Sequence, residues 1–492
     1  RFFCEPRSCA PAEFSALPIK SGMLNDMIPL PPRLSAETRQ DISALWRIAY
    51  PIMIQSAATT AVNLLDALMV GALGDAALTA VNIHTQFFSR LFHVILFGLG
   101  SGGSVFIAQY WGIRDKKTIH RIMGVLLTIG ASLGALFFTG VVLIPDRIIR
   151  FYTNDPAVIR MAGEFLRFQA PVFLFYPVTM VFSAGNRSTG FTRIPMLTGT
   201  SAFLVNLSLN YVLIFGKLGA PALGTKGAAI ATMISRFVEI TLMIALTFRF
   251  GTPAAAKIRE YFVFRRALVV KVLKKSLPVL INETLWGSGV NVYYSLFAQI
   301  STVAAAAAAA VSPIDALLFI TICALGDACA VLIGNELGRG GIAHARRLAD
   351  LARWLNGTSA ALLGLVLFLV RDRILSFYAL SPEALKAASG LLMICALSVP
   401  IRALGYTMMI GILRSGGDVI FCMLADSLSI WLAGIPTTAL LTHGFHFPIT
   451  VVYLGMAAEW VTTATVCTFR VRSGKWANVL TGELPTENAA LS

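Results

Sequence analysis

Apolar runs recur along the chain at intervals that indicate a polytopic membrane protein. A spanning helix needs about 20 mostly apolar residues, and runs of that length or longer fill most of the chain beyond its polar start. We predict twelve spanning helices, at residues 43–71, 76–108, 118–145, 155–187, 195–216, 224–250, 270–300, 305–335, 345–370, 380–413, 419–441 and 448–470. The predicted fold is therefore an all-α membrane protein, and the longer runs indicate helices that tilt or extend beyond the bilayer.

The second half of this pattern repeats the first. The segment DRIIRFYTNDPAVIRMA (146–162) resembles DRILSFYALSPEALKAA (372–388) at an offset of 226 residues, and Pro51 matches Pro278 at an offset of 227. Each copy holds six helices, an even number, so both copies enter the membrane from the same side as parallel repeats. Such repeats are typical of transporters, whose substrate site lies between the halves near the bilayer midplane.

The apolar runs and the polar segments between them divide the chain into five parts, and the charge of the loops predicts its orientation in the membrane. The predicted parts are a polar N-terminal tail (1–42), a six-helix lobe (43–250), a basic linker (251–269), a second six-helix lobe (270–472) and a C-terminal tail (473–492). Lys and Arg gather after predicted helices 2, 6, 8 and 12, whereas the loops after helices 1, 7 and 11 have none. Because cytoplasmic loops are enriched in Lys and Arg, we expect both termini to be cytoplasmic.

The amino-acid composition supports a membrane protein and argues against a nucleic-acid partner. Charged residues make up 13% of the 492 residues, against about 25% in average soluble domains, and the mean hydropathy is +0.74. The net charge of +15 comes from basic loops between apolar runs, so we expect no nucleic-acid partner. We expect a multi-pass protein of a prokaryotic inner membrane, active as a monomer on a small substrate. Met23 is a candidate start, which would place residues 1–22 upstream of the native protein.

One carboxylate, Asp66, lies between apolar residues in the first predicted helix (AVNLLDALMVG, 61–71). A charged side chain at the bilayer centre costs about 2.5–3.5 kcal/mol on insertion scales, so such residues usually have a function. Helical spacing places a second polar residue on the Asp66 face of helix 1 and a polar pair on one face of helix 5, and helix 6 offers a threonine. The residues concerned are Asn63, Asn206, Asn210 and Thr232. Carboxylate, amide and hydroxyl oxygens together can hold a proton or Na⁺, so we predict an ion site; interhelical hydrogen bonding remains open for the amides and Thr232.

The second half carries polar residues of its own, but no acid at the position that matches Asp66, near Tyr293. Helix 7 instead has Asn282 and Glu283, with Asn291 on an adjoining polar face. We interpret Glu283 as a second functional acid. Arg90 and Arg402 fit either counter-ions or groups that repel cationic substrates. The candidate cavity residues are Asn63, Asn282, Asn291, Arg90 and Arg402. The acids without an assigned role are Asp327, Asp426 and Glu459.

Several motifs, in a fixed order, resemble those of one transporter family. They are YPIMIQ and NLLDALMVGALGDAALTAV, then GSGGSVFIAQYWGIRDKKTIHR, then AGNRSTGFTRIPM and NLSLNYVLIFG, and finally GTKGAAIATMISR. Over about residues 40–475 the chain is similar to the multidrug and toxic compound extrusion (MATE) transporters, especially the bacterial NorM-like and DinF-like branches. The resemblance implies two six-helix lobes around a V-shaped central cavity and alternating access. It also implies export of organic cations or amphipathic drugs in exchange for H⁺ or Na⁺, with no other cofactor.

The resemblance also assigns roles to residues. It implies ion coupling by the helix 1 acid, its polar partners on helices 5 and 6 and the helix 7 acid, and helix bending at the helix 1 proline. The corresponding positions are Asp66, Asn206, Asn210, Thr232, Glu283 and Pro51. The chain departs from the DinF-like branch at Asn210, usually Asp there, and from the NorM-like branch at Ala403, also usually Asp. Neither ion site of the family is complete, so the coupling ion stays open.

There are two alternatives, one within transport and one of another class of activity. A flippase for lipid-linked precursors of the same superfamily would also have two lobes, and a basic cavity containing Arg90, Arg236 and Arg402 would suit its charged substrate. A membrane enzyme would need a motif such as DDxxD or HExxH, and the sequence contains neither. We therefore predict a transporter rather than an enzyme.

Overall fold

The computed structural model describes residues 35–263, 266–378 and 380–482, apart from the side chains of Asp75, Gln86, Ser89 and Arg90. The described chain is helical and has no strand. The first half contains α2 (Ala36–Gly71), α3 (Asp75–Phe87), η1 (Phe88–His93), α4 (Val94–Gly112), α5 (Lys116–Leu143), α6 (Pro145–Arg150), α7 (Pro156–Gln169), α8 (Val172–Ser188), α9 (Arg193–Phe215) and α10 (Thr225–Arg249). The linker forms α11 (Ile258–Tyr261).

The second half repeats this arrangement with more interruptions. It contains α12 (Arg266–Ile300), α13 (Thr302–Gly338), α14 (Ile342–Leu375), α15 (Pro382–Tyr406), η2 (Thr407–Arg414), α16 (Val419–Leu428), η3 (Ser429–Gly434), α17 (Ile435–Ala439), η4 (Leu440–Gly444), α18 (Ile449–Tyr453) and α19 (Gly455–Arg472). The η segments are π-helical turns, which lie within the second, tenth and eleventh predicted helices. π-Turns are rare and occur frequently at functional sites.

These elements correspond to the twelve predicted helices, with corrections at their ends. Nine described helices are long and apolar enough to span a membrane, and α7 with α8 forms a tenth span, bent by 51°. The two predicted spans that remain, the seventh and the ninth, are α12 and α14, which carry several basic residues. Three boundaries were wrong: the first helix begins at Ala36 inside the predicted tail, the predicted helix 155–187 breaks between Gln169 and Val172, and α12 begins inside the predicted linker.

The early start of α2 has a local cause. Ser35 has an extended backbone, and its hydroxyl accepts a hydrogen bond from the backbone N–H of Thr38. This side-chain cap satisfies one of the N–H groups left free at the start of a helix. The turns that follow are polar, so hydrophobic patterning could not reveal them.

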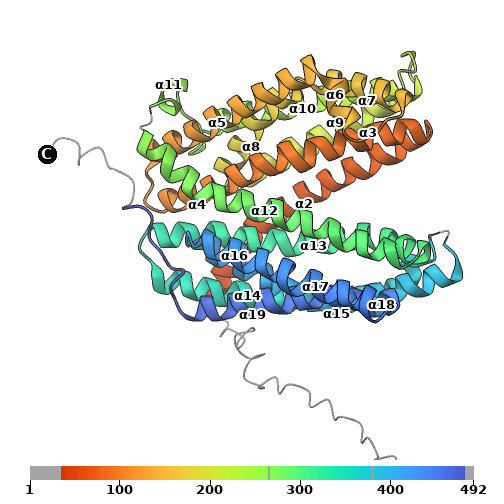
Figure 1. Cartoon of the computed structure of the whole chain (residues 1–492). Coiled ribbons are helices and arrows are strands. Elements are labelled where there is room, and N and C mark those ends of the chain that lie inside the picture. Colours follow the sequence, from red (N-terminus) through yellow and green to blue (C-terminus); the bar gives the residue numbers. More distant parts are fainter. Residues whose placement is uncertain (1–34, 264–265, 379, 483–492) are drawn as a thin grey trace, which may run out of the picture.

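The helices form two lobes that exchange one helix half each (Figure 1). Leu45 and Ile52 of α2 belong to a hydrophobic cluster otherwise built from the second half of the chain. Conversely, Leu268 and Val272 of α12 belong to a cluster built mainly from the first half. The predicted lobe boundaries therefore describe the sequence repeat, whereas the starts of α2 and α12 cross between the lobes.

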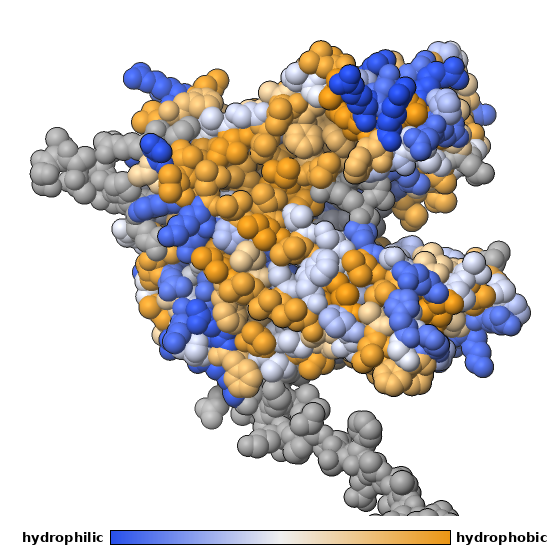
Figure 2. Space-filling view, viewed as in Figure 1, coloured by the Kyte–Doolittle hydropathy of each residue, from blue (hydrophilic) through white to orange (hydrophobic). Residues whose placement is uncertain are grey.

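Close helix contacts join the lobes at the end of the molecule that carries α11, which we call the closed end. A Cβ atom added to Gly112 of α4 would lie 2.2 Å from the carbonyl oxygen of Asn335 in α13. One added to Gly338 would lie 1.9 Å from the carbonyl oxygen of Gln109. Glycine at these positions lets the two backbones touch. At the opposite, open end the lobes part and leave a cleft between them (Figure 2).

The linker packs on the first lobe at the closed end. His120 of α5 contacts Glu260 (3.0 Å) and the Pro253 carbonyl oxygen (3.0 Å). Burial raises the pKa of the Tyr261 hydroxyl to about 12. This hydroxyl therefore stays protonated and donates to the carbonyl oxygen of Ala254 at 2.5 Å. Gly124 makes the fit possible, because its added Cβ would lie 1.5 Å from the Tyr261 carbonyl oxygen.

We expect Gly124→Ala to displace α11 and to lower the free energy of unfolding by about 1–3 kcal/mol, the usual cost of overpacking. Limited proteolysis of the linker in the purified protein measures the displacement, which should appear as faster cleavage. Gly140→Ala is the matched control, because an added Cβ there meets nothing within 4 Å. Equal cleavage rates in the two variants would contradict the prediction.

Candidate functional site

A chain of hydrogen bonds links Asp66 to helices 5 and 6. Asn210 of α9 donates its amide to Asp66 Oδ1 at 2.5 Å and to Asn206 Oδ1 at 3.0 Å. Asn206 in turn donates to the hydroxyl of Thr232 in α10 at 3.2 Å. Asn206 and Asn210 are almost fully buried, at 2% and 0% exposed. The structure thus brings together four of the predicted site residues, which come from three different helices.

The negative charge of the Asp66 carboxylate is not neutralised by an ion pair among the described residues. Arg236 of α10 acts on it electrostatically. However, the Arg236 guanidinium forms its ion pair with Glu239, at 2.8 Å. In the described part of the chain no Lys or Arg forms an ion pair with Asp66. A half-buried carboxylate in a membrane helix is therefore held by an amide alone.

Two other predicted residues of α2 lie apart from this network. Asn63 is exposed, with no side-chain hydrogen bond to the Asp66 group. Pro51 is buried inside α2, which continues through it. The residue four positions on, Gln55, accepts a 2.6 Å hydrogen bond from Arg187 of α8. Pro51 therefore lies where α2 passes from one lobe to the other.

The second lobe gives Glu283 a partner. Both terminal nitrogens of Arg414 donate to Glu283 Oε1 at 3.1 Å, and the Arg414 side chain is 4% exposed. The neighbouring Asn282 is 2% exposed, and its Oδ1 has no hydrogen-bond partner among the described residues. Arg414 is the repeat counterpart of Arg187, which binds neutral Gln55 instead. A carboxylate in a buried ion pair is a structural element first, so the coupling role of Glu283 stays a prediction.

The remaining predicted cavity residues are placed as follows. Arg402 binds Asp315 through both terminal nitrogens, at 2.5 and 3.0 Å, and its guanidinium lies 4.9 Å from the Trp460 ring centre. Asn291 donates to the carbonyl oxygen of Gly287 in its own helix at 2.8 Å. Arg90 lies in η1, but its side chain is outside the described part of the structure.

The structure shows the burial and the hydrogen-bond partners of the three acids to which the sequence assigned no role. Glu459 of α19 is 6% exposed and accepts a 2.7 Å hydrogen bond from the hydroxyl of Tyr293. Asp426 of α16 is 5% exposed. Asp327 of α13 accepts a 3.2 Å hydrogen bond from the hydroxyl of Tyr406. The only sequence signal for Glu459 was an acid within an apolar run, because its partner comes from a helix 166 residues away.

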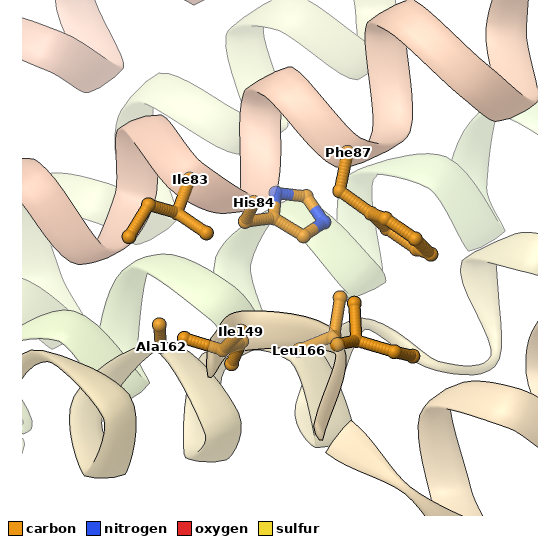
Figure 3. A pocket seen from close by; sticks show the side chains of 7 residues that line it. Ile83, His84, Phe87, Ile149, Ala162 and Leu166 are labelled. Atoms are coloured by element: carbon orange, nitrogen blue, oxygen red, sulfur yellow. The ribbon is translucent and has the colours of Figure 1, made fainter. Parts of the chain in front are cut away.

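One small cavity lies between α3, α6 and α7 (Figure 3). Its lining is apolar except for His84, whose Nε2 has no hydrogen-bond partner among the described residues. The ring of His84 packs on Phe88 and Phe165. This cavity contains no residue of the Asp66 network, so we do not regard it as part of the site.

The side chains of the Asp66 network are one carboxylate, two amides and one hydroxyl. No group of three or more His, Cys, Asp or Glu suited to a metal ion occurs in the described residues. The amide nitrogens of Asn210 and Asn206 point along the chain as donors. A carboxylate that accepts such a donor can take up a proton without rebuilding its surroundings.

This architecture, two six-helix repeats that meet at one end and part at the other, defines a two-lobed membrane transporter. The MatE family model matches residues 51–212 and 278–440, one match in each repeat. The chain therefore belongs to the MatE family.

Two curated relatives agree with this family, and a solved structure agrees with the fold. The chain is 27% identical over 450 residues to the Probable multidrug resistance protein NorM of Thermotoga maritima, covering 88% of this chain and 92% of that protein. It is 28% identical over 425 residues to the Multidrug resistance protein MdtK of Yersinia enterocolitica, covering 81% of this chain and 87% of that one. A mutant of the Vibrio cholerae MATE transporter VcmN superposes with a TM-score of 0.81 at 18% identity, over 90% of this chain and all of that one.

Proposed function

We propose that this protein is a cation-coupled antiporter that exports organic cations or amphipathic drugs by alternating access of its two lobes. The observation that carries the proposal is the Asp66 carboxylate, held by Asn210 and left without an ion pair among the described residues. Its relatives named as multidrug resistance proteins support the substrate class. We propose H⁺ as the coupling ion, because Asp66 is the titratable group of the network and accepts an amide donor from Asn210.

The proposed cycle follows from competition at Asp66. Ionised Asp66 attracts a cationic substrate into the cleft, and an incoming proton neutralises it and releases the substrate. A ligand shifts a conformational equilibrium only through its different affinity for the two states. The proton and the substrate must therefore favour opposite states of the lobes.

We propose that the closed end faces the cytoplasm and that the cleft opens outward. Basic residues of the linker and of the start of α12 gather at the closed end, where the positive-inside rule places them on the cytoplasmic side. They include Lys257, Arg259, Lys271 and Lys274. The protein would then export its substrate across the inner membrane of a prokaryote.

The flippase alternative needs a basic cavity, and two of its three arginines are neutralised. Arg236 pairs with Glu239 and Arg402 binds Asp315 through two nitrogens. An arginine whose donors already bind a carboxylate has few left for a phosphate or sugar acid. A counterflow assay that compares an organic cation with a lipid-linked sugar separates the two functions.

The coupling ion is tested in proteoliposomes with the purified full chain. We expect an imposed proton gradient to drive uptake of tetraphenylphosphonium against its gradient, and a sodium gradient alone to drive none. Transport driven by sodium alone would replace H⁺ by Na⁺ at Asp66. Absence of transport under both gradients would contradict the proposed antiport.

A further inference from the structure

We infer that Glu459 and Tyr293 form a second proton-binding site, which is the counterpart of the Asp66 site in the other lobe. This inference rests on the proposed function. Tyr293 occupies the position 227 residues after Asp66, the same offset that relates Pro51 to Pro278. The repeat therefore places Tyr293 on α12 where Asp66 lies on α2.

The helices around the two sites also correspond. The Asp66 network joins helices 1, 5 and 6, whose repeat counterparts are helices 7, 11 and 12. Tyr293 comes from helix 7, and Glu459 comes from helix 12. Helix 11 supplies Gly434, whose added Cβ would lie 1.8 Å from the Tyr293 hydroxyl oxygen and 3.0 Å from Glu459 Cβ. The lobes thus place a carboxylate at equivalent points, but from different helices.

Helix 11 is shaped around this pair. Its π-turn η3 (Ser429–Gly434) ends at Gly434, directly beside the Tyr293 hydroxyl. The side chain of Ile430 in the same turn lies over Gly289 of α12, where an added Cβ would lie 2.4 Å from its Cδ1. These contacts bring helices 7, 11 and 12 close together, so that solvent reaches only 6% of Glu459 and none of Tyr293.

The charges around Glu459 favour exchange of a proton over a fixed ion pair. The basic group that acts electrostatically on Glu459 is Arg402 of α15, which already binds Asp315 through two nitrogens. Asp426 of α16 interacts with Glu459 electrostatically and, being an acid, offers it no compensating positive charge. Hydrogen bonds from Tyr293 and Trp286 favour the ionised form of Glu459. A buried carboxylate without a cation beside it is nevertheless costly, whereas the neutral acid has no charge cost. Movement of helices 7, 11 and 12 therefore changes the proton affinity of this group.

Infrared difference spectroscopy of the purified full chain tests this site, because each protonated carboxyl group has its own C=O stretching band. A pH titration of the wild type should show bands of buried carboxyl groups, of which Asp66→Asn removes one and Glu459→Gln another. Tyr293→Phe should shift the Glu459 band by removing its hydrogen bond. Glu383→Gln, at an exposed acid of the same lobe, is the matched control and should leave both bands unchanged.

A spectrum that Glu459→Gln leaves unchanged would overturn the inference, and so would a Glu459 band that no pH alters. The spectrum does not require transport. A protein without gradient-driven uptake but with both bands would retain this site while the proposed function fails.

A separate observation leads to a second proposal: residues 474–482 form a strap that holds the closed end shut. After α19 the chain turns at Gly474, which has a positive φ of 68°, and runs along both lobes at the closed end (Figure 1). Trp476 is 1% exposed in a cluster of the second lobe. Leu480 is 1% exposed in a cluster of the first lobe. One short segment thus has an apolar anchor in each lobe.

Hydrogen bonds fix the strap to both lobes between these anchors. On the first lobe, Gln109 of α4 donates to the carbonyl oxygen of Asn478 at 3.1 Å and accepts from the backbone N–H of Leu480 at 2.7 Å. The Tyr110 hydroxyl donates to the carbonyl oxygen of Thr481 at 3.0 Å. On the second lobe, the Asn478 amide donates to the carbonyl oxygen of Gly416 at 3.0 Å. Opening the closed end separates these groups, so the strap must release from one lobe.

Distances between spin labels at Lys116→Cys and Ala343→Cys report opening of the closed end in liposomes, with the native cysteines replaced. We expect Leu480→Ala to raise the ratio of open to closed molecules about tenfold, which corresponds to about 1.4 kcal/mol. A chain ending at Gly474 should raise it further. The control is Val479→Ala, since Val479 is 40% exposed. If the label distances in Leu480→Ala and in the chain ending at Gly474 both match those of the control, the proposal that this segment holds the closed end shut is wrong.

Discussion

Asp66→Asn is expected to reduce proton-driven uptake of tetraphenylphosphonium to the level of empty liposomes, while the protein folds and inserts normally. The Asn side chain keeps an oxygen that accepts the Asn210 amide, so the network of hydrogen bonds survives. It removes the one group of this network that changes charge. Without this charge change the proton and the substrate no longer compete at Asp66, so the proposed exchange there cannot couple a gradient to uptake.

The control for this variant is Asp146→Asn, which changes an exposed acid in the first turn of α6. It should transport like the wild type. The measurement is the initial uptake rate per reconstituted protein, with insertion checked by protease accessibility of the linker. Undiminished uptake by Asp66→Asn would remove Asp66 from the coupling mechanism.

Asn210→Leu is an informative intermediate variant. It removes the donor to Asp66 but keeps the carboxylate, and a hydrogen bond to a charged group is worth about 1.5–3 kcal/mol. The proton concentration for half-maximal uptake should therefore change by about tenfold or more, while coupling persists. This outcome would separate the coupling group from the residue that positions it.

The sequence predicted the helices and the Asp66 network well, because both depend on local patterns. Apolar runs predict spanning helices, and four-residue spacing places Asn206 and Asn210 on one face. The interruptions were not predictable in this way, since the π-turns and the α7–α8 break arise from packing against other helices. The crossing of α2 and α12 between the lobes was hidden for the same reason.

The second lobe shows the limit of reasoning by resemblance. Sequence matching assigned Glu283 a coupling role and found no acid opposite Asp66. In the structure Glu283 binds Arg414, whereas the acid near the matching position, Glu459, comes from another helix. No single sequence motif contains both Tyr293 and Glu459. Their proximity could not be predicted from motifs, because only the packing of the folded helices brings the two residues together.

Glu283 is therefore expected to act as the structural partner of Arg414. Glu283→Leu leaves a buried guanidinium without its carboxylate, and breaking such a pair costs about 3–5 kcal/mol. We expect a large fall in the apparent melting temperature of the purified protein. Glu283→Gln keeps an oxygen that accepts from Arg414, so the fall should be much smaller and proton-driven transport should persist.

The double variant Glu283→Leu with Arg414→Met distinguishes this role from ion coupling. Replacing both members of a buried ion pair by apolar residues is often neutral or stabilising. Stability should therefore recover in the double variant relative to Glu283→Leu alone, which a coupling acid acting independently of Arg414 would not show. If Glu283→Gln instead folds normally but loses all transport, Glu283 couples an ion as its resemblance to the NorM-like acid implies. The second lobe would then couple through Glu283, at its ion pair with Arg414.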